Sequence, residues 1–220
     1  MTIDAVVFDM DGVLVDSEPT WSDVRRRFVL AHGGRWPDGA DRRMQGMATL
    51  EWARYLHDEL GVDLPVPTIA ERVVAEMAER HGDGPPLLPG AVEAVRRVAR
   101  RWPLGLASSS PARLIARTLE AAGLAPSFSV VLSTEEIGAG KPAPDVYLEA
   151  ARRLGVPPSR CAAVEDSTNG LRAARAAGMR VIAVPTRSYP PDPEELDRAD
   201  AVLGSLAELT EEVVDPALTA

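Results

Sequence analysis

Two aspartates separated by one residue follow an apolar segment near the start of the chain. Asp9 and Asp11 come directly after residues 5–8, whose sequence is Ala-Val-Val-Phe. Four apolar residues with two β-branched members predict a buried strand. Polar groups just past the carboxyl end of such a strand stand where open α/β sheets bind ligands. Because two ionised carboxylates this close repel each other, the pair indicates a bound cation, an acid–base pair, or both.

Further polar side chains follow other predicted strands at the same end. The set comprises Ser108 after the strand at 104–107, Lys141 after the strand at 129–132, and Glu165 and Asp166 after the strand at 161–164. In a parallel sheet the carboxyl ends of the strands share one edge. We therefore expect these side chains to gather around Asp9 and Asp11 in a single crevice.

This combination of groups suits phosphoryl transfer. Clustered carboxylates form an oxygen-rich site for Mg²⁺. A cation, a lysine and a hydroxyl together can position a phosphoryl group and neutralise its charge. One carboxylate can attack phosphorus and form an aspartyl-phosphate, while a second protonates the leaving oxygen and then deprotonates water. Asp9 and Asp11 can supply both roles.

Lys141 is the only lysine in the sequence. The other 23 of the 24 basic residues are arginine. A compact ammonium on a flexible stem reaches into spaces that a planar guanidinium cannot enter. In a chain that otherwise uses arginine, this position is one where an arginine would not serve.

The pattern of elements predicts two domains. From residue 88 onward strands alternate with helices, which predicts a Rossmann-like α/β fold, a parallel sheet with helices on both faces. Residues 35–85 show no strand and contain predicted helices at 50–60 and 68–80, ended by a Gly/Pro-rich linker. We therefore expect an α/β core formed by residues 1–14 and 86–220, and an inserted all-helical cap at 15–85. Ser17 is expected to cap a helix that runs to residue 31.

Composition narrows the class of partner. The chain has 220 residues and a net charge of −9, which argues against nucleic acid because phosphate backbones are bound by Lys and Arg. Cys161 is the only cysteine, no signal peptide is evident and no apolar stretch is long enough to span a membrane. We expect a cytoplasmic protein, a monomer or weak homodimer, that binds a small phosphorylated metabolite.

Taken together, the motifs resemble those of a known superfamily. They are Asp9-Met-Asp-Gly-Val-Leu-Val-Asp-Ser-Glu-Pro, Ser108 at a strand end, Gly-Lys141-Pro-x-Pro-Asp, and Glu165-Asp166-Ser. In this order they resemble the four motifs of the haloacid dehalogenase superfamily, and more narrowly its sugar-phosphate phosphatase and β-phosphoglucomutase branch. The resemblance implies a core of that superfamily with a helical cap, Asp9 as the nucleophile and Asp11 as the general acid and base.

The resemblance also implies a binding role for each remaining motif residue. Ser108 and Lys141 would bind the phosphoryl group. Mg²⁺ would be held by Asp9, Asp166 and the carbonyl of Asp11, with Glu165 beside it. The other substrate-binding positions that it implies are Gly12, Glu18, Gly46 and Ser109.

The activity that these residues favour is hydrolysis of a phosphate monoester of a small sugar or polyol. Two alternatives remain, a phosphosugar mutase like β-phosphoglucomutase and a non-catalytic phospho-acceptor domain. A mutase must hold a bisphosphate. The sequence has Trp21, Thr49 and Pro111 where the resembled mutase has histidine, arginine and lysine, and this difference favours the phosphatase.

Overall fold

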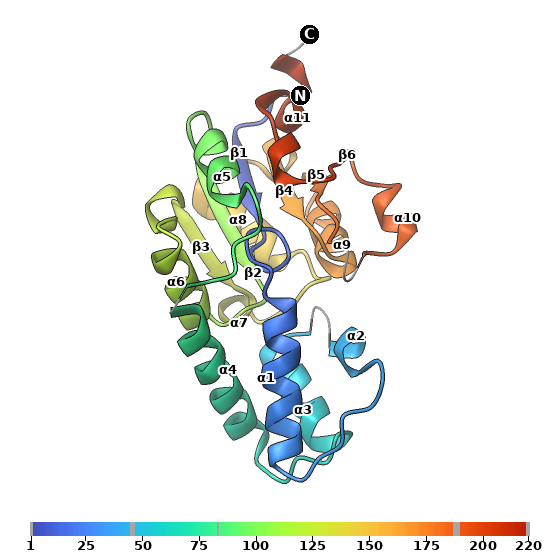
Figure 1. Cartoon of the computed structure of the whole chain (residues 1–220). Coiled ribbons are helices and arrows are strands. Elements are labelled where there is room, and N and C mark those ends of the chain that lie inside the picture. The colour runs from blue at the N-terminus through green and yellow to red at the C-terminus, as the bar shows by residue number, and fades with distance from the viewer. Residues whose placement is uncertain (1, 45–46, 83, 187–189, 219–220) are drawn as a thin grey trace.

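The computed structural model describes residues 2–44, 47–82, 84–186 and 190–218. Figure 1 shows an α/β core and a separate group of helices below it. The core is a six-stranded parallel sheet in the order β3-β2-β1-β4-β5-β6. Its strands are β1 (Ala5–Phe8), β2 (Leu104–Ser108), β3 (Val130–Ser133), β4 (Cys161–Glu165), β5 (Arg180–Ala183) and β6 (Ala201–Val202).

Alternation along β1 builds a hydrophobic core on each face of the sheet. Val6 and Phe8 belong to one buried cluster, while Ala5 and Val7 belong to another. Successive side chains of a strand point to opposite faces, so a strand buried on both faces is apolar throughout. In register, Val7 lies opposite Gly105 on one side and Ala163 on the other. The site-bearing strand therefore lies in the middle of the sheet.

Helices cover both faces of this sheet. Apolar residues of α5 and α6 join the cluster that contains Phe8, and those of α8 and α9 join the cluster that contains Val7. The helices of the core are α5 (Ala91–Ala99), α6 (Ala112–Ala121), α7 (Thr134–Ile137), α8 (Asp145–Leu154), α9 (Thr168–Ala176), α10 (Pro193–Leu196) and α11 (Glu211–Val214), with short 3-10 turns at Ala125–Ser127, Pro158–Arg160, Leu206–Glu208 and Pro216–Leu218.

The cap has a hydrophobic core of its own. Its helices are α1 (Glu18–Ala31), α2 (Ala40–Met44), α3 (Thr49–Asp58) and α4 (Val66–Gly82). Trp21 and Trp52 meet in its centre with ring centroids 5.9 Å apart. One core residue, Leu114 of α6, is buried in the same cluster, and α4 packs along α6. Helix α6 is thus a main anchor of the cap on the core.

The two chain segments that join cap and core run side by side. The amide of Asp16 donates to the carbonyl of Pro86 over 2.8 Å, and the amide of Leu88 donates to the carbonyl of Leu14 over 2.9 Å. Both crossings occur at the carboxyl edge of the sheet, next to Asp11. Cap movement would therefore be transmitted directly to the loop that carries both aspartates.

The predicted elements match the structure closely, with two differences. Ser17 does not cap α1 with its side chain, because its hydroxyl donates to Asp11 Oδ1 over 2.5 Å. The prediction of a capping role was therefore wrong. The short helices α2, α7, α10 and α11 were not predicted, since each has only four or five residues. No helix in the described part of the chain is long and apolar enough to span a membrane.

Candidate active site

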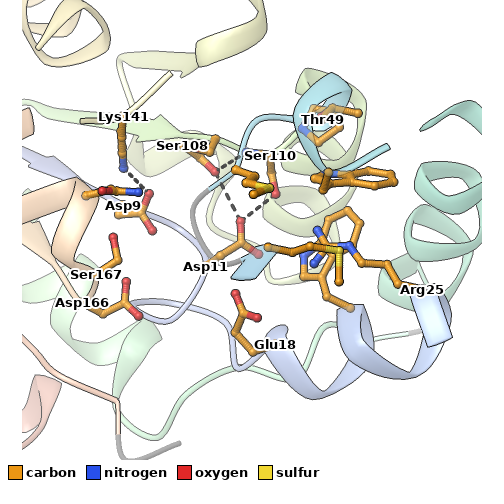
Figure 2. A pocket seen from close by; sticks show the side chains of 17 residues that line it. Asp9, Asp11, Glu18, Arg25, Thr49, Ser108, Ser110, Lys141, Asp166 and Ser167 are labelled. Atoms are coloured by element: carbon orange, nitrogen blue, oxygen red, sulfur yellow. Dashed lines mark hydrogen bonds and ion pairs between the residues drawn. The ribbon is translucent and has the colours of Figure 1, made fainter. Parts of the chain in front are cut away.

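A pocket between core and cap brings the predicted site residues together. Asp9 and Asp11 follow β1, Ser108 ends β2 and Asp166 follows β4, so all stand at one edge of the sheet (Figure 2). Lys141 reaches the same place from the loop before α8. The cavity has a volume of about 80 Å³, which leaves room in this conformation for a small molecule only.

Lys141 lies at the floor of this pocket with an acceptor for each of its three donors. Its Nζ is 2.6 Å from Asp9 Oδ1, 2.5 Å from Glu165 Oε1 and 3.0 Å from the carbonyl oxygen of Ala107. The side chain is 4% exposed. Burial alone would lower the pKa of Lys141, but the carboxylates of Asp9 and Glu165 outweigh it and raise the pKa well above its usual value. The ammonium is therefore charged and fixed in position.

Glu165 serves mainly as an anchor within the site. Its Oε1 accepts from Lys141 and from the hydroxyl of Tyr147, the latter over 2.7 Å. Its Oε2 accepts from the backbone amides of Asp166 and Ser167. Both oxygens are engaged by protein donors, so this carboxylate holds Lys141 and the loop after β4 in place.

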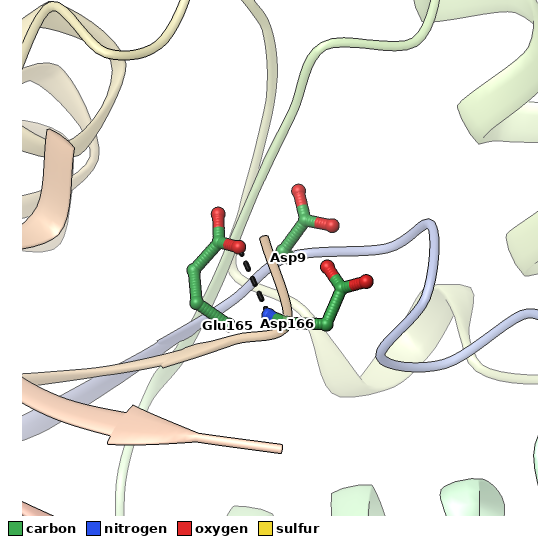
Figure 3. Close-up of side chains that lie close together, drawn as sticks. All are labelled: Asp9, Glu165 and Asp166. Atoms are coloured by element: carbon green, nitrogen blue, oxygen red, sulfur yellow. Dashed lines mark hydrogen bonds between the residues drawn. The ribbon is translucent and has the colours of Figure 1, made fainter. Parts of the chain in front are cut away.

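Three carboxylates come close enough to share a cation. Oxygens of Asp9, Glu165 and Asp166 lie within 4.8 Å of one another and all three residues are buried (Figure 3). Burial raises the pKa of Asp9 to about 8, opposed by Lys141 and assisted by Glu165. Burial and the same glutamate raise the pKa of Asp166 well above its usual value. Asp9 and Asp166 thus have the donor chemistry and the electrostatic need for a divalent cation.

Asp11 is held by hydroxyl groups rather than by cations. Ser17 donates to its Oδ1, and Ser110 and Ser108 donate to its Oδ2 over 2.7 and 3.3 Å. A hydroxyl can also accept, so the same contacts remain available when Asp11 carries a proton. The two aspartates therefore have different hydrogen-bond partners. Asp11 is bonded to serine hydroxyls, whereas Asp9 is bonded to the ammonium of Lys141.

Gly12 shapes the loop without lining the pocket. Its φ is +81°, and a Cβ at this position would overlap the carboxylate of Asp166. Its amide donates to the carbonyl of Val15 over 2.8 Å. The residue allows the loop after β1 to lie against Asp166, and a direct role in substrate binding, which the sequence predicted, stays a prediction.

The cap contributes the other wall of the pocket. Glu18 of α1 lines it, and Ser109, which follows β2 in the core, lines the same pocket. Substrate binding by these two residues stays a prediction. Burial raises the pKa of Glu18, against an opposing effect of Arg25. Gly46 lies outside the described residues, but Thr49, three positions later, lines the pocket.

Several lining residues were not predicted to belong to the site. They are Arg25, Met44, Met47, Trp52, Ser110, Ser167 and Asn169. Arg25 could have been found, because Trp21, Val24, Arg25 and Phe28 follow the spacing of a buried helix face. A charged residue in that pattern is a signal of function. The serines carried no signal, since the direction of their hydroxyls depends on tertiary packing.

Comparisons with known proteins agree with this geometry. The family model described as haloacid dehalogenase-like hydrolase matches residues 3–178. Hexitol phosphatase B of Escherichia coli is 38% identical over 213 residues, which cover 94% of each chain. A phosphorylated carbohydrates phosphatase of Thermotoga maritima is 33% identical over 82% of this chain and 84% of its own.

A solved structure shows that the fold is also similar to that of a known protein. The crystal structure of CbbY from Rhodobacter sphaeroides in complex with phosphate superimposes with a TM-score of 0.86. It is 30% identical and covers 97% of this chain and 100% of its own. Core and cap both fall within this superposition.

Proposed function

This chain belongs to the haloacid dehalogenase-like hydrolase family and is a phosphatase, and from that premise we propose that it is a Mg²⁺-dependent hydrolase of small sugar or polyol phosphates that works through an aspartyl-phosphate. The observation that carries the proposal is the buried group of Asp9, Lys141 and Asp166 at the floor of the pocket. Hydrolase relatives that act on hexitol phosphates or phosphorylated carbohydrates support the substrate class.

The residues at the site fit a magnesium ion. Asp9 and Asp166 would hold it with carboxylate oxygens, together with the backbone carbonyl of Asp11, and Glu165 would stand beside it. When bound, Mg²⁺ supplies positive charge that offsets the charge on the phosphoryl oxygens. Burial raises the pKa of both Asp9 and Asp166 when no metal is bound. A bound cation would stabilise their ionised forms, which supports the metal site.

The chemical roles follow from the two different aspartate environments. A carboxylate oxygen of Asp9 attacks phosphorus, and the bond from phosphorus to the leaving oxygen breaks while Asp11 gives that oxygen a proton. Water then attacks phosphorus, Asp11 takes a proton from the water, and the bond to Asp9 breaks. Lys141, whose three N–H groups are taken by Asp9, Glu165 and Ala107, supplies positive charge beside the phosphoryl group, and Ser108 orients its oxygens during both steps.

The first experiment measures phosphate release from a panel of hexose, pentose and hexitol phosphates with and without Mg²⁺. We expect turnover that disappears when the metal is chelated. β-Glucose 1-phosphate belongs in the panel, because its conversion to glucose 6-phosphate without release of phosphate would identify a mutase instead. Absence of any turnover would leave a non-catalytic phospho-acceptor.

A second experiment addresses the intermediate. The enzyme is mixed with substrate, quenched in acid within a single turnover and digested, and the peptides are analysed by mass spectrometry. We expect phosphate on the peptide that contains Asp9, and none on the same peptide from the Asp9→Asn variant. Turnover without a phosphorylated peptide at any quench time would argue for direct attack by water.

A further inference from the structure

Arg25 is a buried cation on the cap side of the pocket. It lies on α1, is 7% exposed, and lines the same cavity as the catalytic group (Figure 2). Its neighbours on the same helix, Arg26 and Arg27, are exposed. Arginine is almost never this buried without a partner.

The guanidinium of Arg25 has no hydrogen-bond partner among the described residues. Its Nε is buried without an acceptor, and no ion pair joins the group to a carboxylate of the described chain. Its contacts are with aromatic rings, 4.4 Å from the ring centroid of Trp21 and 4.8 Å from that of Trp52. Ring faces attract a cation, but they leave the Nε–H donor unsatisfied.

The charge on Arg25 persists at neutral pH. Burial lowers the pKa of this guanidinium to about 10, against the opposing influence of Glu18, Asp41 and Asp11. These three acids attract it from a distance without touching it. A buried charged donor that lacks an acceptor destabilises the folded chain. A ligand in the pocket that offers an acceptor to Arg25 would therefore be bound favourably.

We infer that Arg25 is a specificity residue that binds a carboxylate on the leaving group, so that the preferred substrates are small phosphate monoesters with an acid group at the end opposite the phosphate. This inference rests on the proposed phosphatase function and deepens it. A guanidinium matches a carboxylate with two parallel N–H···O bonds. A neutral hydroxyl would satisfy one donor and leave the buried charge uncompensated.

The groups around Arg25 on the cap side of the pocket are bulky and apolar. Met44, Met47 and Trp52 line the pocket beside it. A planar carboxylate is the smaller of the two oxyanions that pair with a guanidinium. The ring centroids of Trp21 and Trp52 lie 4.4 and 4.8 Å from the guanidinium carbon, and Nε is left without an acceptor.

The test compares two substrates that differ only at the far end. Gluconate 6-phosphate and glucitol 6-phosphate have the same hydroxylated chain and end in a carboxylate and an alcohol, respectively. We expect the wild-type kcat/KM to be about 10- to 100-fold higher for gluconate 6-phosphate, the range that a charged hydrogen-bonded pair supplies. Comparing kcat/KM for fructose 1,6-bisphosphate and fructose 6-phosphate tests in the same way whether Arg25 binds a second phosphate.

Variants assign the preference to Arg25. Arg25→Met keeps an unbranched apolar stem without the guanidinium charge, and should bring the ratio for the first pair close to one. Arg25→Lys should keep part of the ratio because it keeps the charge. Arg26→Met, an exposed neighbour on the same helix, should keep the full wild-type ratio.

Each outcome decides between the two claims. If wild type hydrolyses gluconate 6-phosphate no better than glucitol 6-phosphate, the carboxylate subsite is wrong and the phosphatase proposal stands. A larger preference for the bisphosphate would replace the carboxylate with a phosphate. If no phosphate ester of any kind is hydrolysed, the proposed function itself fails. Should Arg25→Met not fold, the wild-type ratios still decide.

Discussion

Three acceptor oxygens surround the ammonium of Lys141 and leave no room for a larger cation. The carboxylates of Asp9 and Glu165 and the carbonyl of Ala107 all lie within 3.0 Å of Nζ. A guanidinium placed here would overlap one of these groups or withdraw from the phosphoryl position. The sequence already suggested this restriction, because every other basic residue of the chain is arginine.

We therefore predict that Lys141→Arg lowers kcat by about 100-fold or more, the scale seen when one preorganised donor at a reacting centre is lost. Steady-state kinetics at saturating Mg²⁺ would measure it. Arg152→Lys is the matched control, because the side chain of Arg152 is 71% exposed and should tolerate the reverse exchange. Activity of Lys141→Arg within a few-fold of wild type would show that charge alone is sufficient.

Replacing Asp9 by asparagine should lower activity but raise stability at the upper end of the pH range. Burial raises the pKa of Asp9 from 3.8 to about 8 in the metal-free protein. Between these values the unfolded chain is ionised while the folded chain keeps the proton, so the free energy of unfolding falls as pH rises through this window. Asp9→Asn should abolish turnover and remove the part of this pH-dependent loss of stability that Asp9 contributes, leaving the part that comes from Asp166.

The measurement is urea denaturation of both proteins across that pH range, with and without Mg²⁺. The wild type should regain stability when Mg²⁺ is added, most strongly near the upper end of the range, because metal binding displaces the proton. Asp9→Asn should gain little. Equal stabilisation of both proteins by Mg²⁺ would contradict a metal-ligand role for Asp9.

At the residue scale, position along the strands made most of the site predictable. Asp9, Lys141 and Asp166 follow strands, and strand ends of a parallel sheet meet. Ser110 and Arg25 could not be placed in the same way, because their roles depend on where a side chain points after the cap closes on the core. A helix face that includes one arginine was the single sequence signal available for Arg25.

At the scale of elements, α4 and α6 meet around a buried histidine. His81 lies in the last turn of α4 and is 0% exposed, and its Nδ1 lies 2.9 Å from the hydroxyl oxygen of Thr118 on α6. That hydroxyl donates to the carbonyl of Leu114, so it accepts from the histidine. Nδ1 therefore carries the proton, and Nε2 is buried without a partner.

This contact predicts that the cap–core junction is sensitive to acid. Burial lowers the pKa of His81 below its ordinary value of 6.5. As pH falls below 6.5, His81 becomes protonated in the unfolded chain but stays neutral in the folded chain. The free energy of unfolding therefore falls on acidification. His81→Leu should reduce this loss. Denaturation midpoints measured on both sides of that pH would show it, and an unchanged acid dependence would contradict it.

The sequence predicted long elements well and short ones poorly. The three long helices of the cap, α1, α3 and α4, and the six strands were recognisable from apolar periodicity and from glycine and proline at their ends. Helices of four residues such as α7 and α11 carry too few residues for a period to show. The contact between His81 and Thr118 joins residues 37 apart in sequence, and no local pattern indicates it.

At the scale of the whole molecule, the core reaches into the cap through one side chain. Leu114 starts from α6 of the core, yet it is buried in the apolar cluster of the cap. In the closed form the cavity is small, so substrate has to enter while the cap is displaced. Displacement exposes Leu114, and its burial therefore contributes to the closed state.

Leu114→Ala should favour the open form. We expect a higher KM and a loss of about 2–5 kcal/mol in the free energy of unfolding. Leu119→Ala is the control, because Leu119 is on the same helix and 3% exposed but belongs to the core cluster. It should lose similar stability with KM unchanged. An equal rise in KM for both variants would trace the effect to general destabilisation of α6.

The buried position of the only lysine also gives the protein an unusual surface. Apart from Lys141, the chain offers no ε-amine to acylating reagents, and that amine is 4% exposed behind the closed cap. Acylation of Lys141 therefore requires displacement of the cap and also loss of the proton that Asp9 and Glu165 stabilise on Nζ. At constant pH its rate should fall when a ligand fills the pocket, and a single labelled peptide would report that protection.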